Sequence, residues 1–152
     1  MKKLIVSSPC FEDGGLIPVK YTGHGEDVSP ELVLDDLSEM AESIAIIMDD
    51  MGHPIPAYNH WVIWNIPAIS LIPENIPHGE QVDSLGAIQG CGYGKHRYRG
   101  LSHHLIGHIF ITLMSFRWIV VLIYQALPEK KDLLAAMQGH ILQKSVLAGH
   151  YR

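Results

Sequence analysis

The sequence predicts an all-β domain with a few short helices. Fourteen glycines and nine prolines break its 152 residues into short apolar runs. These runs are rich in Ile, Val and Trp, which favour strands. The chain has the usual length of one domain, and 47% hydrophobic residues suffice for one core. We therefore expect a single domain over residues 1–152.

Two apolar runs are the clearest strands, residues 43–48 and 60–66. Neither run alternates between apolar and polar residues, which indicates that both of its faces are covered. Both are expected to be central strands of a packed sheet.

The end of the sequence predicts one amphipathic helix followed by a short strand. Pro128 and Glu129 are typical of a helix start. Apolar residues then follow at helical spacing: Leu133, Leu134, Met137 and Ile141. Residues 143–151 are expected to form the last strand.

Charge and cysteine content exclude several classes of protein. A net charge of -5 and a pI near 6.0 give no basic surface for nucleic acid. The apolar run at residues 4–6 is too short for a secretory signal, so we expect a cytoplasmic protein. Cys10 and Cys91 match no disulfide framework or zinc motif and are expected to be ordinary thiols.

A first group of polar residues follows the strand at residues 43–48. Asp49 and Asp50 precede Gly52 and His53, and His60 opens the next strand. A His held beside an acid stays partly protonated and donates hydrogen bonds, so such a pair can bind phosphate. Strand-end acids are also common in turns, and a lone His is often structural. The pattern alone leaves both interpretations open.

A second group is glycine-rich, residues 86–94, and is followed by basic residues up to Gly100. Glycines let the backbone approach a ligand and offer amide donors. The spacing matches neither a phosphate loop nor a dinucleotide fingerprint, so by itself it indicates only a loop.

Taken in order, these groups resemble bacterial, Raf-kinase-inhibitor-like members of the phosphatidylethanolamine-binding protein family. The similar stretches are Ser8-Pro9 to Tyr21, Asp27-Val28-Ser29-Pro30, Asp49 to Pro54, His60 to Pro67, Gly86 to Gly100 and Asp132 to Tyr151. The resemblance implies a two-sheet fold and a pocket for a small anion, such as a phosphate-bearing phospholipid head group.

The resemblance also implies which residues bind the anion. Asp50 and His60 would line the pocket, and Gly100 would supply backbone at its rim. The family usually has a second acid where this chain has Gly52, so the pocket would lack one carboxylate. Eukaryotic relatives are linked to kinase inhibition, but no protein partner can be read from this sequence. We expect a binding domain without enzyme activity, cofactor or bound metal, and leave a homodimer open.

The resemblance fails over residues 101–127. The family continues with Pro-x-Pro-Pro and His-x-Tyr, whereas this chain has Leu101, His103, His104, Ile109 and Ile111 at those positions. Read in the neighbouring frame, permitted codons give the three prolines and the His-x-Tyr. We therefore expect a reading-frame slip over residues 101–124, compensated near residues 125–128, and an impaired pocket.

Two alternatives take the chain at face value. Residues 105–127 have the length of a membrane span, although Arg117 near its centre would be costly there. In the other, residues 109–122 take the place of one or two buried strands. Alternate residues would then face opposite sides of the sheet, with Ile109, Ile111 and Leu113 on one side and Phe110, Thr112 and Met114 on the other. As a separate class, a metal-dependent hydrolase could use Asp49, Asp50 and histidines, although no His-Glu-x-x-His motif is present.

Overall fold

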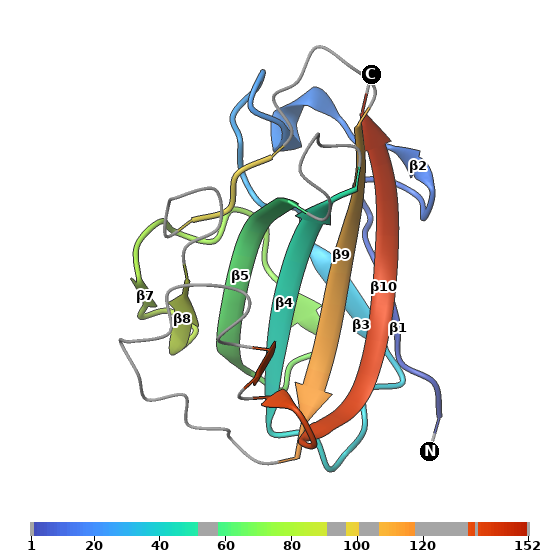
Figure 1. Cartoon of the computed structure of the whole chain (residues 1–152), viewed down its shortest axis with the longest axis vertical. Coiled ribbons are helices and arrows are strands. Elements are labelled where there is room, and N and C mark those ends of the chain that lie inside the picture. Colours follow the sequence, from blue (N-terminus) through green and yellow to red (C-terminus); the bar gives the residue numbers. More distant parts are fainter. Residues whose placement is uncertain are drawn as a thin grey trace.

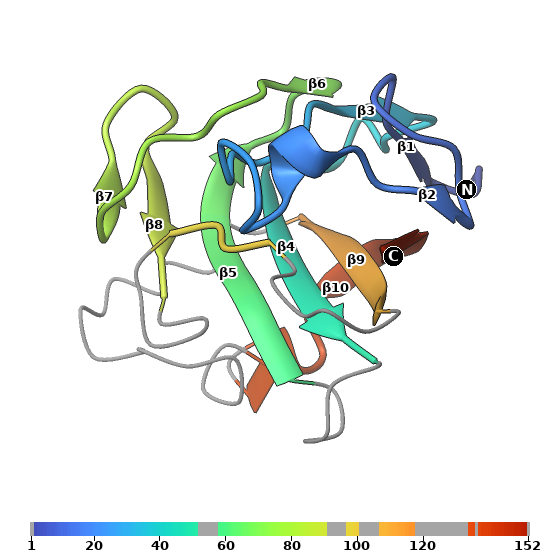
Figure 2. The same cartoon turned by 90° about the horizontal axis from the view of Figure 1, so that it is seen from above.

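Two β-sheets packed face to face form the part of the chain that the computed structural model describes, residues 2–51, 58–90, 97–100, 107–117, 134–135 and 137–151. Figure 2 shows the smaller sheet above the larger one. The smaller sheet has the order β1-β3-β6 and the larger β2-β10-β9-β4-β5-β8-β7. The two-sheet, β-rich architecture expected from the sequence is confirmed.

The strands are short except for the four at the centre of the large sheet (Figure 1). Their bounds are β1 Ile5–Ser7, β2 Gly15–Leu16, β3 Leu32–Asp35, β4 Ser43–Asp50, β5 Tyr58–Pro67, β6 Leu71–Ile72, β7 Gln81–Val82, β8 Ala87–Gln89, β9 Gly107–Phe116 and β10 Ile141–Tyr151. A 3-10 turn, η1, covers Val19–Tyr21. These strands pair antiparallel, apart from the parallel pair of β2 with β10.

Both faces of β4 and β5 are covered, as their unbroken apolar runs predict. Side chains such as Ile46 and Ile63 belong to the main core between the two sheets. Their neighbours Ile47 and Val62 belong to a second apolar cluster on the outer face of the large sheet. Burial on both faces explains why neither run alternates with polar residues.

Strand β9 lies between β4 and β10 although it belongs to the segment that departs from the family. Ile109, Ile111 and Leu113 enter the main core, while Met114 and Phe116 belong to the outer cluster. Arg117 is exposed directly after the strand. Apolar residues, some of them β-branched, therefore fill both faces of β9. This agrees with the alternative in which residues 109–122 take the place of buried strands.

The membrane alternative is wrong for residues 107–116, which form a strand inside the sheet. No helix among the described residues is both long enough and apolar enough to cross a bilayer. Residues 105, 106 and 118–127 of that alternative lie outside the described part.

The predicted C-terminal helix ends earlier than expected. Residues 134, 135 and 137 are helical, but Ile141, assigned to the helix by spacing, is the first residue of β10. Gly139 has φ +83°, a left-handed conformation that glycine adopts readily and that ends a helix. The last strand is confirmed and starts two residues before the predicted position.

Candidate functional site

Asp50 and His60 lie in contact at one end of the large sheet. Asp50 is the last residue of β4 and His60 the third of β5. His60 Nε2 lies 3.2 Å from Asp50 Oδ2, and both side chains are fully buried. The sequence placed these two side chains together, and the structure does so too. Both side chains lie inside the fold with no exposed surface, whereas the resemblance implies that they line a pocket for an anion.

The second ring nitrogen of His60 fixes where the protons lie. His60 Nδ1 is 2.8 Å from the carbonyl oxygen of Arg99, which can only accept, so Nδ1 carries a proton. A hydrogen bond between Nε2 and Asp50 then needs a second proton on one of these two groups. The pair is thus either an imidazolium with a carboxylate or an imidazole with a carboxylic acid. Either form is neutral overall.

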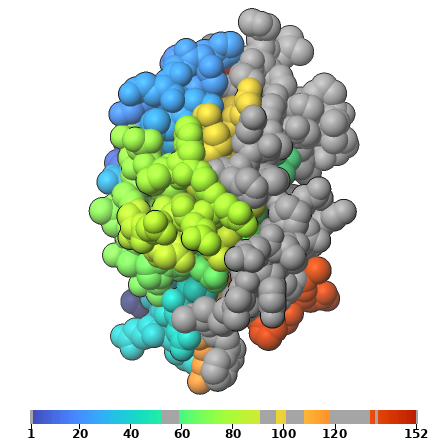
Figure 3. All heavy atoms as spheres, turned by 90° about the vertical axis from the view of Figure 1, so that its left-hand side faces the viewer, coloured from blue at the N-terminus to red at the C-terminus, as the bar shows by residue number. Residues whose placement is uncertain are grey.

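Asp27 holds the segment 97–100 that carries this carbonyl. Its carboxylate accepts hydrogen bonds from Arg97 Nη2 at 2.8 Å and from the amide of Gly100 at 2.6 Å. The same carboxylate thus clamps both ends of the segment. Figure 3 shows residues 97–100, in yellow, at the surface beside the blue N-terminal part. Asp27 has φ 57°, a left-handed conformation that Asp tolerates better than most residues.

Tyr98 anchors the middle of the segment. Its hydroxyl donates to the carbonyl of Tyr21 at 2.6 Å, and its ring packs edge-on against Trp61 at 5.4 Å between centroids. Burial, and then the nearby negative charge of Asp27, raise the pKa of Tyr98. The phenol therefore stays protonated and keeps donating.

Tyr21 is itself fixed by a charged pair. Its hydroxyl donates to Glu74, which also accepts from Lys20 Nζ at 3.1 Å. Burial is the main cause that raises the pKa of Tyr21. The hydrogen bonds from Tyr21 and Lys20 lower the pKa of Glu74. Lys20, Tyr21 and Glu74 thus fix η1, which accepts the hydrogen bond from Tyr98 of the segment 97–100.

Gly100 has a steric role. A Cβ at this position would lie 2.1 Å from the carbonyl oxygen of Tyr21 and 2.8 Å from Thr22 Cα. Its amide already donates to Asp27. The rim role expected for Gly100 is therefore not that of an open amide donor, and ligand contact by its backbone stays a prediction.

Other candidates of the sequence are separated from the pair or fall outside the described residues. Asp49 lies on the face of β4 opposite to Asp50, where its Oδ1 accepts a hydrogen bond from Asn59 Nδ2 at 3.1 Å. Gly52, His53 and the loop residues 91–96 lie outside the described part. Among the residues that the structure describes, no group of three or more His, Cys, Asp or Glu side chains could hold a metal ion.

Sequence reasoning missed the residues that position the pair. Asp27 and Tyr98 stand in stretches that carried the resemblance, but neither had a role. Gln89 was also missed: its buried amide accepts from Trp61 Nε1 at 2.8 Å and donates to the carbonyls of Pro77 and Gly79. The sequence offered two weak signals for these residues. Asp27 stands two residues before Ser29-Pro30, and Gln89 is a polar residue directly after the apolar Ala87-Ile88.

Comparison with known proteins decides the family. The sequence profile of phosphatidylethanolamine-binding proteins matches residues 7–152, a range that includes the departing segment. The chain belongs to this family. It is 37% identical over 152 residues to a UPF0098 protein of Archaeoglobus fulgidus, covering 99% of this chain but only 52% of that protein. It thus spans about half the length of that relative.

Shorter relatives and solved structures agree with this assignment. A UPF0098 protein of Methanothermobacter thermautotrophicus is 37% identical over 145 residues, which cover 93% of this chain and 94% of the relative. The crystal structure of a family homologue from Chlamydia trachomatis matches with a TM-score of 0.82 at 24% identity, over 100% of this chain and 99% of that one. E. coli YbcL matches with a TM-score of 0.80 at 18% identity, over 99% of both chains. Both structures show the family fold.

Proposed function

We propose that this family member is a binding domain for a small anion, such as phosphate or a phosphate-bearing head group, and not an enzyme. The observation that carries the proposal is the buried contact of 3.2 Å between His60 and Asp50. Both ring nitrogens of His60 already have partners, so a bound anion would replace Asp50 as the acceptor from Nε2 of the protonated imidazole, in a charge-assisted hydrogen bond. The phosphatidylethanolamine-binding family supports this class of ligand.

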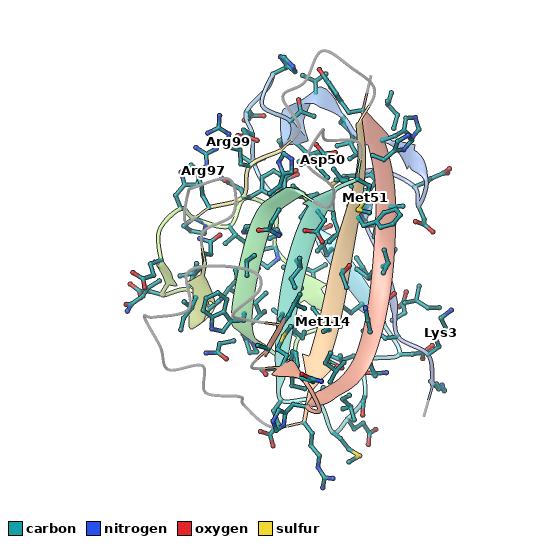
Figure 4. All side chains as sticks on the ribbon, in the orientation of Figure 1. Lys3, Asp50, Met51, Arg97, Arg99 and Met114 are labelled. Carbon is teal, nitrogen blue, oxygen red and sulfur yellow. The ribbon has the colours of Figure 1, made fainter. Side chains whose placement is uncertain are left out.

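The charges around the pair support an anion of low charge. Figure 4 shows Arg97 and Arg99 at the same end of the sheet as Asp50. Arg97 is paired with Asp27. With His60 protonated, this imidazolium and the two arginines outnumber the carboxylates of Asp27 and Asp50 by one charge at this end of the sheet. The resulting positive excess is small, which favours a weakly held monoanion over a polyphosphate.

Burial supports weak binding. Neither Asp50 nor His60 has any accessible side-chain surface. An anion can reach them only if covering atoms move, and the free energy of that movement reduces the affinity. We propose that the pocket is impaired for this reason, and also because this chain lacks the Pro-x-Pro-Pro sequence that follows Gly100 in the family.

Binding of inorganic phosphate and of phosphorylethanolamine tests the site. In the double variant Asp50→Asn/His60→Gln the pair keeps its approximate shape and loses its charges. We expect its affinity, measured by calorimetry, to fall roughly tenfold or more, because a hydrogen bond to a charged group contributes about 1.5–3 kcal/mol. The matched control is Asp35→Asn/His78→Gln at exposed positions, which should leave the affinity unchanged. Equal losses in both variants would contradict the assignment.

The frame slip is tested by the gene. We expect codons 101–124, read in the neighbouring frame, to encode the prolines and the His-x-Tyr without a stop. A chain with this segment restored, including Leu101→Pro, His103→Pro, His104→Pro and Ile109→His, should bind phosphate more tightly and melt at a higher temperature. The added histidine supplies a donor, and polar residues return to the solvent face. A stop codon in that frame would refute the slip.

A further inference from the structure

Met51, His108 and His150 form a row across three neighbouring strands at the upper end of the large sheet. Asp50 and Ile109 face the core, so the residues next to them, Met51 and His108, face outward. The amide of Met51 donates to the carbonyl of His108 at 2.7 Å. His108 is directly opposite His150 on β10. Figure 4 shows Met51 at this end of the sheet.

The two imidazoles are close enough to share one ion. Their centroids are 6.3 Å apart with the ring planes tilted by 44°. Metal–nitrogen bonds of about 2.0–2.1 Å place two rings on one ion roughly 5 to 6 Å apart between centroids, the longer value for a nearly linear arrangement. His108 is exposed, so a small rotation of its ring closes the difference.

His150 is already held in the form that binds a metal. Its Nδ1 lies 3.0 Å from the carbonyl oxygen of Gly14, so Nδ1 carries the proton and Nε2 presents its lone pair. A backbone acceptor on the second ring nitrogen is the usual support of a metal-bound histidine. Met51 is 47% exposed, so its thioether is accessible beside the pair.

We propose that Met51, His108 and His150 bind a copper(I) ion. The thioether is a soft ligand and imidazole also binds copper well, so this set favours copper(I) over magnesium or calcium, and nothing in the row is a hard oxygen ligand. This outer-face site is separate from the inward-facing Asp50 and His60. The neighbouring reading frame permits Thr at position 108, and a frame-restored chain with Thr there would lose this site.

Competition with a chromophoric copper(I) chelator, under anaerobic reducing conditions, tests the site. The background is Cys10→Ser/Cys91→Ser, because thiolates would also take the metal. We expect one copper(I) ion per chain. Met51→Leu and His150→Gln should each weaken binding roughly tenfold or more, because even the partners of metal ligands contribute 10- to 100-fold.

Two readouts separate this site from binding by scattered histidines. The control His78→Gln/His140→Gln removes two exposed imidazoles elsewhere and should leave the copper(I) affinity unchanged. X-ray absorption of the loaded protein should show sulfur and nitrogen scatterers, and the sulfur should vanish in Met51→Leu. Copper(I) affinity that is the same in Met51→Leu, or that falls as much in the control as in His150→Gln, would overturn the proposal.

Discussion

His60→Leu is expected to destabilise the fold by about 3–5 kcal/mol, because it removes the imidazole that shares a proton with the buried Asp50 side chain. The effect is large because both side chains are fully buried. The carbonyl of Arg99 also loses its donor. The free energy of unfolding from urea denaturation measures the loss.

A double-mutant cycle separates the pair from simple loss of packing. Asp50→Leu/His60→Leu removes both polar groups, so it should cost less than the sum of the single variants by about 0.5–3 kcal/mol. His78→Leu, at an exposed position, should stay within about 0.5 kcal/mol of the parent chain. Additive single effects would mean that Asp50 and His60 do not interact in the folded protein.

Gly100→Ala should have the second largest effect, at least about 1–3 kcal/mol, the usual range for overpacking. The new Cβ would lie 2.1 Å from the Tyr21 carbonyl oxygen, and backbone atoms cannot rotate away as a side chain can. The segment 97–100 would have to shift. That shift would break the bond from the Gly100 amide to Asp27 and displace the carbonyl that holds His60.

Gly86→Ala is the matched control for this steric effect. A Cβ there meets nothing within 4 Å, so its cost is only that of the left-handed conformation, φ +67°. Both variants lower the melting temperature, but only Gly100→Ala should move the ring resonances of His60. Undisturbed His60 resonances in Gly100→Ala would contradict the link between this segment and the pair.

The long strands β4, β5 and β10 were predicted, and β9 was one of the alternatives, because the signals of these strands are local. The apolar runs of β4 and β5 and the alternation of β9 can be read from neighbouring residues alone. The helix end was not predicted, because apolar spacing continued to Ile141 while the left-handed Gly139 had already stopped the turn. Conformation at one glycine outweighed the periodicity of its neighbours.

The candidate site was only partly predictable. Asp50 and His60 were assigned through the family resemblance, since their local pattern also fits ordinary turn chemistry. The role of Asp27 could not be predicted, because it depends on contact with Arg97, 70 residues further along the chain. Burial of the pair was not predicted either. It depends on the packing of segments that are distant in sequence.

The central claim, that anions bind at the Asp50–His60 pair, is tested most directly by the imidazole ring resonances of His60. Phosphorylethanolamine should shift these resonances and the amide of Gly100 with one saturation curve. The rings of the exposed His78 and His140 should not follow that curve. If the His60 ring stays unchanged while ligand binds, the anion site lies elsewhere on the protein.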